Sequence, residues 1–575
     1  MEFDDDTFNK IKIIILKNAV EYEEARLDAV ISKIIAMDPD FKKEIKKIIP
    51  KIKEEIDKIN GLPKKSQIEL LKEIDPAYGH KKINTKDKKE FNLPKLNNAI
   101  EGFVVTRFPP EPNGYPHIGH AKAAIIDEEY ARHYKGKFIL RFDDTNPLNE
   151  KIEYYDAILE GIKWLKINPD IIKNTSDDIN LLHKYGKEII KSDRAYICTC
   201  RPDTIHKLRA KGIQCKCRKD LSITLENMDK IFGGYFHTND AIIRFKGDMS
   251  GKNTAMRDPT LFRIIEKEHP KLGNKIFLWP TYDFAAPIED SLDGVTHALR
   301  TKEYELRNEL YRTILKTLKL RIPEVIEFSR LEFEGLPVSK RKIKPLIENS
   351  VIKGWDDPRL PTLIAFKKRG FTPEAIRQFV LSLGLTLSET KPSMQILESF
   401  NRKIIEHESK RLFFVNEPFK ITLKNCPPLD VKIKNHPSLN MGTRNVSVKD
   451  ILYISSVDAR KLNIGSELRL IELYNIVIKE INFKEKEALA YCSGKVLRND
   501  IPKIQWVSNE GFVEYKIVKP NVLFIKEKFN PDSLKILHGF AESFVSTLSK
   551  DTRIQFIREG FCRIEDSNTS IFTHR

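Results

Sequence analysis

The sequence predicts a multidomain α/β protein organised around a doubly wound, Rossmann-like parallel sheet. Its 575 residues are too many for one hydrophobic core. Apolar, β-type runs at 103–106 and 137–142 flank a strongly helical segment from Ile118 to Ala131. Strand, helix and strand joined by short loops are typical of parallel sheets, whose ligands lie beyond the carboxyl ends of the strands.

The loop after the first strand has the composition of a phosphate-binding turn. Residues 107–120 read R-F-P-P-E-P-N-G-Y-P-H-I-G-H, and the prolines with Gly114 end the strand. His117 and His120 then stand at a helix N-terminus, which gathers unpaired N–H groups and partial positive charge. Gly119 leaves room for a flat base. Two histidines at this spacing are more often ordinary surface or core residues, so the pattern alone is weak.

The charge balance favours a polyanionic partner. The chain has 99 Lys and Arg against 82 Asp and Glu, a formal charge of +17. Nucleic acid is the leading candidate, although a general lysine bias would produce the same excess. The sequence has no run of eighteen apolar residues and starts with an acidic segment, so we expect a cytoplasmic protein without a membrane anchor. Seven cysteines in so long a chain do not indicate a disulfide framework.

Changes in periodicity divide the chain. Helical spacing of apolar residues precedes a charged linker at 80–95, and short strands begin near residue 411. Between them, the pattern from 196 onward interrupts the nucleotide-binding fold as an inserted domain would. The predicted parts are a helical accessory domain with its linker, the first catalytic half, the insert, the second catalytic half, a helical region and β-barrels, at 1–95, 96–195, 196–277, 278–345, 346–410 and 411–575.

The insert contains four cysteines in two C-x-C pairs. They are Cys198 with Cys200, and Cys215 with Cys217. Four thiols in a reducing compartment are the donor set of a tetrahedral structural zinc site. The C-x-C spacing is less specific than C-x₂-C, so free thiols are the alternative.

Two longer strings resemble known signatures. P-x-P-N-G-x-x-H-I-G-H at 110–120 is similar to the HIGH signature of class I aminoacyl-tRNA synthetases. F-P-P-E-P-N-G-Y at 108–115, followed by R-F-D-D-T-N-P at 141–147, resembles their glutamyl/glutaminyl branch. L-P-V-S-K-R-K at 336–342 partly resembles the KMSKS loop, with proline and valine in place of its first lysine and methionine.

The resemblance implies roles for particular residues. The predicted catalytic residues are His117, His120 and Lys340, with Lys340 neutralising charge that builds on the phosphates. The predicted ATP-binding residues are Pro110, Glu111, His117, Gly119, His120, Ser339 and Lys340. The predicted amino-acid ligands are Arg107, Asp143, Tyr282 and Arg300, with Asp143 receiving the α-ammonium group.

Arg300 favours glutamate over glutamine as the amino acid. A side-chain carboxylate needs a fixed cation, and guanidinium presents a two-pronged donor face to it. In this branch, glutaminyl enzymes typically carry cysteine at the position of Arg300 and can carry histidine at that of Ala286. The alternative is that Arg300 pairs with a neighbouring acid such as Glu303.

Short strands at the C-terminus indicate the archaeal and eukaryotic, glutaminyl-like form of the glutamyl enzyme, because the bacterial form is helical there. They lie at 431–433, 468–471, 476–478, 488–491, 513–517 and 522–525. The resemblance implies a glutamate–tRNA ligase that uses ATP and Mg²⁺ on tRNA(Glu), with tRNA(Gln) as a second candidate. The insert would hold the acceptor end and the barrels the anticodon. The alternatives are a glutaminyl-tRNA synthetase and a catalytically inactive RNA-binding paralogue.

Overall fold

The structure is a computed structural model that describes residues 5–22, 24–25, 27, 30–31, 33–34, 41–75, 91, 93–219, 221–389 and 391–575. The chain forms two compact units, Met1–Phe91 and Asn92–Arg575, and each is described by itself. Of the predicted linker at 80–95, residues 80–90 and 92 lie outside the described residues.

The first unit is helical in its described part, as its apolar periodicity predicts. It contains α1 (Asp5–Tyr22), α3 (Phe41–Asn60) and α4 (Lys64–Ile74). Isoleucine and leucine side chains at helical spacing are buried between these helices, among them Ile11, Ile15, Leu16, Ile52, Ile56 and Leu71.

A parallel sheet lies at the centre of the second unit and confirms the predicted doubly wound class. Strands β1 (Val105–Phe108), β2 (Lys137–Phe142) and β3 (Ile171–Asn174) pair in parallel. Strands β8 (His297–Thr301) and β9 (Glu324–Phe328) form a second parallel pair. The N–H of Thr296 donates to the carbonyl of Val105 (2.9 Å) and joins the two groups of strands.

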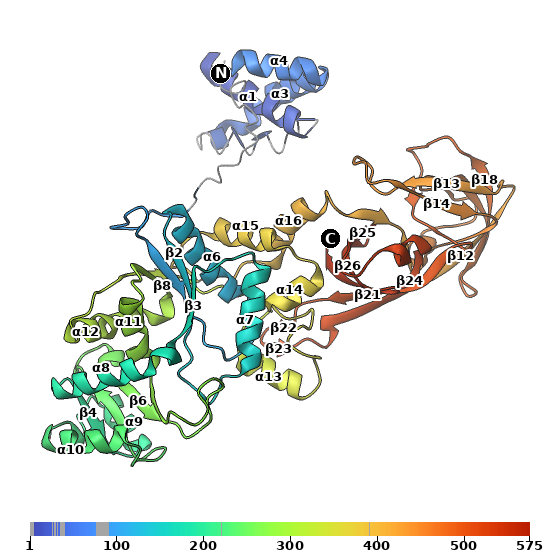
Figure 1. Ribbon diagram of the computed structural model, residues 1–575. Helices are drawn as coiled ribbons and strands as arrows, with labels where there is room; N and C mark the ends of the chain where they lie inside the picture. The colour runs from blue at the N-terminus through green and yellow to red at the C-terminus, as the bar shows by residue number, and fades with distance from the viewer. Residues whose placement is uncertain are drawn as a thin grey trace. The chain divides into compact units, whose positions relative to one another are not determined.

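Helices cover this sheet and connect its strands. Figure 1 shows α6 beside β2 and β8. Bounds of the helices in the catalytic and following regions are α6 (Ile118–His133), α7 (Ile152–Trp164), α8 (Ile179–Lys191), α11 (Tyr282–Leu292), α12 (Asn308–Thr317), α13 (Lys340–Glu348), α14 (Leu363–Arg369), α15 (Pro373–Leu383) and α16 (Met394–Ile405).

The first strand starts later than predicted. The run at 103–106 was expected to be buried, but β1 begins at Val105 and the Phe103 side chain is 72% exposed. A turn explains the difference, because the N–H of Phe103 donates to the carbonyl of Ile100 (3.0 Å) and holds Phe103 out of the sheet. The second predicted strand matches β2 from end to end.

The inserted region is a four-stranded antiparallel sheet with two helices. Its strands lie in the order β4 (Ala195–Cys198), β5 (Ile242–Phe245), β6 (Thr260–Ile264) and β7 (Leu278–Pro280). Helices α9 (Pro202–Ala210) and α10 (Leu221–Phe232) connect the first two strands. The last strand leads directly into α11 of the catalytic region.

The C-terminal part consists of two seven-stranded sheets, as the short strands predict (Figure 1). The first contains β10 (Lys410–Leu412), β11 (Phe414–Asn416), β21 (Phe512–Pro520), β24 (Leu534–Glu542), β25 (Arg553–Phe556), β26 (Gly560–Asp566) and β27 (Thr569–His574). The second contains β12 (Pro418–Lys424), β15 (Ile451–Ser455), β16 (Glu467–Leu470), β17 (Asn475–Asn482), β18 (Glu487–Gly494), β19 (Lys503–Ile504) and β20 (Val507–Ser508).

Smaller elements complete this region. They are the hairpin of β13 (Leu429–Lys434) and β14 (Thr443–Val448), the helix α17 (Ser456–Ala459), and the hairpin of β22 (Phe524–Ile525) and β23 (Lys528–Phe529). A disulfide joins Cys426 and Cys492. In the part of the chain that the structure describes, no helix combines the length and apolar character that crossing a membrane requires.

The β22–β23 hairpin contacts the loop that precedes α13. The N–H of Phe524 donates to the carbonyl of Gly335 (3.0 Å), and Lys342 pairs with Glu527. Gly335 has a φ of +70°, and a Cβ on it would lie 2.8 Å from the carbonyl oxygen of Phe524. A glycine is therefore required where the C-terminal region meets the lysine-rich loop.

Candidate active site

A cavity of about 370 Å³ opens where β1 and β8 end and α6 begins. Most of the predicted site residues line it, namely Arg107, Pro110, Glu111, His117, Gly119, His120, Tyr282 and Arg300. Asp143, Ser339 and Lys340 are not among its lining residues. The cavity lies where the topology of a parallel sheet places a ligand.

His117 and His120 cap the first turn of α6 reciprocally. Nδ1 of His117 accepts the N–H of Gly119 (3.1 Å), and Nδ1 of His120 accepts the N–H of His117 (3.2 Å). Burial lowers the pKa of His117 well below its usual value and that of His120 to about 4, with Lys340 and Arg330 adding to the effect. Both rings are therefore neutral at pH 7. Since Nδ1 accepts, each ring carries its proton on Nε2 and can donate from there.

Lys340 contacts the loop between β1 and α6, which lines the cavity. Its Nζ donates to Oδ1 of Asn113 (2.8 Å), a cavity-lining residue, and lies 5.3 Å from the ring centre of Tyr154. A Cβ on Gly114 would lie 2.2 Å from Cε of Lys340, so glycine permits this approach. Burial lowers the pKa of Lys340 to about 8. Ser339 precedes it as the N-cap residue of α13.

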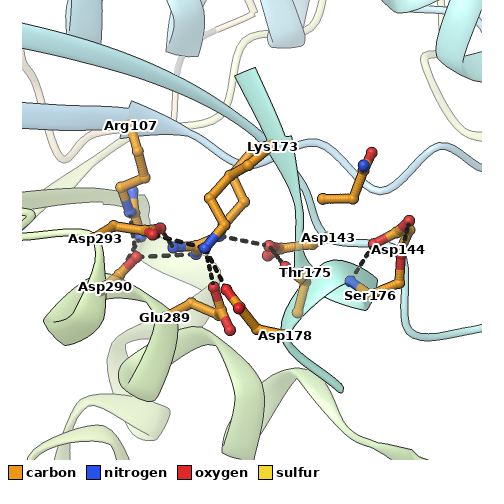
Figure 2. A network of polar contacts seen from close by, with 12 residues as sticks. Arg107, Asp143, Asp144, Lys173, Thr175, Ser176, Asp178, Glu289, Asp290 and Asp293 are labelled. Atoms are coloured by element: carbon orange, nitrogen blue, oxygen red, sulfur yellow. Dashed lines mark hydrogen bonds and ion pairs between the residues drawn. The ribbon is translucent and has the colours of Figure 1, made fainter. Parts of the chain in front are cut away.

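A buried carboxylate, Asp290 on α11, holds two arginines behind the cavity. Its Oδ1 lies 2.9 Å from Nε of Arg107 and 2.9 Å from Nη2 of Arg141, and Tyr311 donates to its Oδ2 (2.8 Å). Figure 2 shows Asp290 with Arg107 on one side. Burial alone would raise the pKa of Asp290, but the charges of Arg107 and Arg141 prevail and lower it to about 2.

Arg107, one of the predicted amino-acid ligands, pairs with a carboxylate of the fold. Its side chain is 1% exposed, two of its nitrogens bind Asp290, and Nη1 donates to the carbonyl of Leu299 (2.7 Å). Arg107 lines the cavity, but its charge is balanced by a protein carboxylate.

Arg300 is the cation that the cavity leaves available. It is 5% exposed, its Nη1 donates to Oδ1 of Asn308 (3.1 Å), and its Nε has no hydrogen-bond partner among the described residues. Three tyrosine rings surround its guanidinium at 5.0 to 5.6 Å, those of Tyr282, Tyr304 and Tyr311. The alternative pairing with Glu303 is wrong, because Glu303 pairs with Arg330 (3.0 Å).

Asp143 stands at the carboxyl end of β2 with one oxygen unused. Its Oδ1 accepts from Nε of Arg141 (3.1 Å) and from the hydroxyl of Thr175 (3.0 Å; Figure 2). Oδ2 has no partner among the described residues. Burial raises its pKa, against the opposing effect of Arg141.

The cavity-lining residues that sequence reasoning missed include Asn113, Asp127, Tyr304 and Arg330. Arg330 follows β9 by two residues, so the rule that ligands bind beyond the ends of parallel strands could have found it. Asp127 gives no such signal, because charged residues are common in helices.

The four cysteines of the insert converge. The Sγ atoms of Cys198 and Cys215 are 3.7 Å apart, those of Cys200 and Cys217 are also 3.7 Å apart, and all four lie within 4.8 Å of one another. Zn–S bonds of about 2.3 Å in a tetrahedron require S···S separations of about 3.8 Å. The cluster therefore has the donor set and the spacing of a zinc site.

The comparisons with known proteins agree over the whole chain. Residues 103–407 match the catalytic domain of tRNA synthetases class I (E and Q), and residues 409–495 and 503–565 match the anticodon-binding domains of the same class.

Curated archaeal relatives match from end to end. The chain is 45% identical to a glutamate–tRNA ligase of Cenarchaeum symbiosum, covering 99% of this chain and 100% of the relative. It is 44% identical to that of Nitrosopumilus maritimus (100% of both) and 35% identical to that of Pyrococcus furiosus (97% and 98%).

The buried pairing of Asp290 yields a stability prediction. Asp290→Asn should destabilise the catalytic region by about 3 to 5 kcal/mol, because Arg107 would remain buried without a counter-charge. Tyr311→Phe, which removes one hydrogen bond to Asp290, should cost only about 1 kcal/mol. Chemical denaturation of the three proteins at pH 7 measures both differences.

The same pair predicts a pH dependence with a definite sign. The pKa of Asp290 in the folded protein is lowered to about 2. Its contribution to the free energy of unfolding is therefore complete above the unfolded-state pKa of about 4 and is lost as the pH falls from there towards 2. The difference in free energy of unfolding between the parent protein and Asp290→Asn should decrease as the pH falls over that interval. Equal stability of the two proteins at pH 7 would contradict the assignment.

Proposed function

The chain belongs to the class I tRNA synthetases of the E and Q group, and we propose on this basis that it joins glutamate to the 3′ end of tRNA(Glu) with ATP. In the first step, the α-carboxylate of glutamate attacks the α-phosphorus of ATP, and pyrophosphate leaves. In the second, a hydroxyl of the terminal adenosine of tRNA attacks the carbonyl carbon of glutamyl-adenylate, and AMP leaves.

The start of α6 and Lys340 act on the phosphates. Nε2–H of His117 and of His120 donate to phosphate oxygens, together with the helix N-terminus. The ammonium group of Lys340 offsets the negative charge that builds on the α-phosphate and the departing pyrophosphate. Positioning of the two reactants supplies much of the remaining acceleration. Mg²⁺ enters with ATP as part of the substrate.

The assignment of glutamate as the amino acid depends on one observation, the guanidinium of Arg300 that is not ion-paired among the described residues. A buried guanidinium that no carboxylate of the described residues pairs with favours an anionic ligand. The side-chain carboxylate of glutamate supplies that charge, while the neutral carboxamide of glutamine would not. Asp143 offers its unused oxygen to the α-ammonium group, and the ring of Tyr282 packs beside Arg300.

The two alternatives from the sequence fit these contacts less well. A glutaminyl enzyme would leave Arg300 without a counter-charge, and no curated relative described above has that name. A catalytically inactive paralogue would not need His117, His120 and Lys340 in their present arrangement. Charging of tRNA(Gln) and a cytoplasmic location stay predictions.

Replacing Arg300 should impair the use of glutamate selectively. In Arg300→Gln, the KM for glutamate in tRNA(Glu) charging should rise by about 100-fold or more, because a desolvated charge pair contributes about 2 to 5 kcal/mol. The KM for ATP should change by less than about threefold. Arg307→Gln is the matched control, since Arg307 lies nearby but pairs with Asp283 at the surface. Equal losses for glutamate and ATP would contradict the role of Arg300.

We also propose that Cys198, Cys200, Cys215 and Cys217 hold a structural zinc ion, on the support of their converging thiols. Elemental analysis of the purified protein should find about one zinc per chain. The double variant with Cys200→Ser and Cys217→Ser should contain no zinc, and the melting temperature of its insert should be lower than in the parent. Cys562→Ala, a buried cysteine outside the cluster, should retain the metal. Metal-free protein with unchanged stability after chelator treatment would refute the site.

A further inference from the structure

Asp127 is a buried acid that lines the cavity with one carboxylate oxygen unpaired among the described residues. It lies on α6, two turns beyond His120, and is 1% exposed. Its Oδ1 has no hydrogen-bond partner among the described residues. The contact that ties this turn of α6 to β1 is made by the backbone, since the hydroxyl of Thr106 donates to the carbonyl of Asp127 (2.7 Å). A buried polar group without a protein partner is costly unless a ligand completes it.

Asp127 lines the same cavity as the predicted amino-acid ligands Arg107, Tyr282 and Arg300. Arg107 is close enough to both Asp127 and Tyr282 for their charges to influence its own pKa. Tyr282 in turn packs against Arg300, the predicted ligand of the substrate carboxylate. Asp127 and Arg300 line this cavity from α6 and from β8, and Arg107 and Tyr282 lie between them in this chain of contacts.

The charges around Asp127 favour its neutral form. Burial raises its pKa well above the usual value, Arg107 opposes this, and Asp290 adds to it. Arg107 is itself balanced by Asp290, and His120 on the same helix is neutral.

The other charged side chains that line this cavity either pair with a protein group or, in the proposed function, bind a ligand. Arg330 is paired with Glu303, and Glu111 lies at the phosphate end near Lys340. Arg300 is the cation that the substrate carboxylate balances. A second negative charge beside the substrate carboxylate would be unfavourable here, which favours the neutral form of Asp127.

We propose that Asp127 is a specificity-determining residue, which as a neutral carboxylic acid donates a hydrogen bond to the side-chain carboxylate of glutamate beside Arg300. This inference rests on the proposed function, because it concerns the same amino-acid pocket. The ionised form of Asp127 would repel the substrate carboxylate in a pocket of low dielectric constant. Glutamate affinity therefore depends on the proton of Asp127 and decreases when that proton is lost at alkaline pH.

The test measures the KM for glutamate in tRNA(Glu) charging, at saturating ATP and tRNA, from about pH 6 to about pH 9.5. Asp127→Asn keeps the shape and a donor but cannot ionise, so its KM should stay within about threefold of the parent at pH 7 and should lack the parent's alkaline rise. Asp127→Leu cannot donate, and its KM should increase by about tenfold or more.

Two controls separate this role from a structural one. Glu128→Gln removes the neighbouring carboxylate of α6, which pairs with Arg377 outside the cavity, and should leave the KM for glutamate and its pH profile as in the parent. The KM for ATP should be unchanged in Asp127→Asn and Asp127→Leu. If Asp127→Leu does not fold, the pH dependence of the KM for glutamate in Asp127→Asn tests the proposed role of Asp127 by itself.

Several results would overturn the inference. They are a parental KM in Asp127→Leu, an impairment of Asp127→Asn as large as that of Asp127→Leu, or the same pH profile in Asp127→Asn and the parent. Each of these leaves the proposed function intact, because the parent still charges tRNA with glutamate. A parent protein that does not use glutamate would instead contradict the proposed function itself.

Discussion

The ionised carboxylate of Asp290 is the contact on which the site depends. It lies on α11 and binds Arg107 of β1, Arg141 of β2 and Tyr311 of α12, so four elements converge on one buried charge. Removing such ions from water costs several kcal/mol each, and only close pairing offsets that cost. The pairing therefore fixes the spacing between the sheet and α11, the helix that begins with Tyr282.

Because of this arrangement, the cations of the site have different partners. Arg107 is balanced within the fold, whereas no carboxylate of the described residues pairs with Arg300. In the function that we propose, Lys340 and the start of α6 bind the phosphates and Arg300 binds the amino acid. The first lysine of the KMSKS signature is absent, since Pro337 occupies its place, and Lys340 stands at the position of the second lysine. The hairpin that reaches Gly335 gives the C-terminal sheets a direct contact with the same loop, so the parts that face tRNA and ATP are physically joined.

The structural features that could be predicted from the sequence are those determined by residues close to one another in the chain. Strand β2 and the start of α6 follow from apolar pattern, prolines and glycines within a few residues. The role of Arg107 could not be predicted, because its partner Asp290 lies 183 positions away and a single chain does not reveal the pairing. Asp127 was missed for a related reason, since only the packed helix shows that it faces the cavity.

The most direct test of the account is a comparison of amino acids in tRNA charging. Purified protein is supplied with ATP, Mg²⁺ and tRNA(Glu), and labelled glutamate or labelled glutamine is the only amino acid. The account predicts that glutamate is attached to tRNA and that glutamine is not, because only glutamate provides the charge that Arg300 lacks. Attachment of glutamine without attachment of glutamate would contradict it.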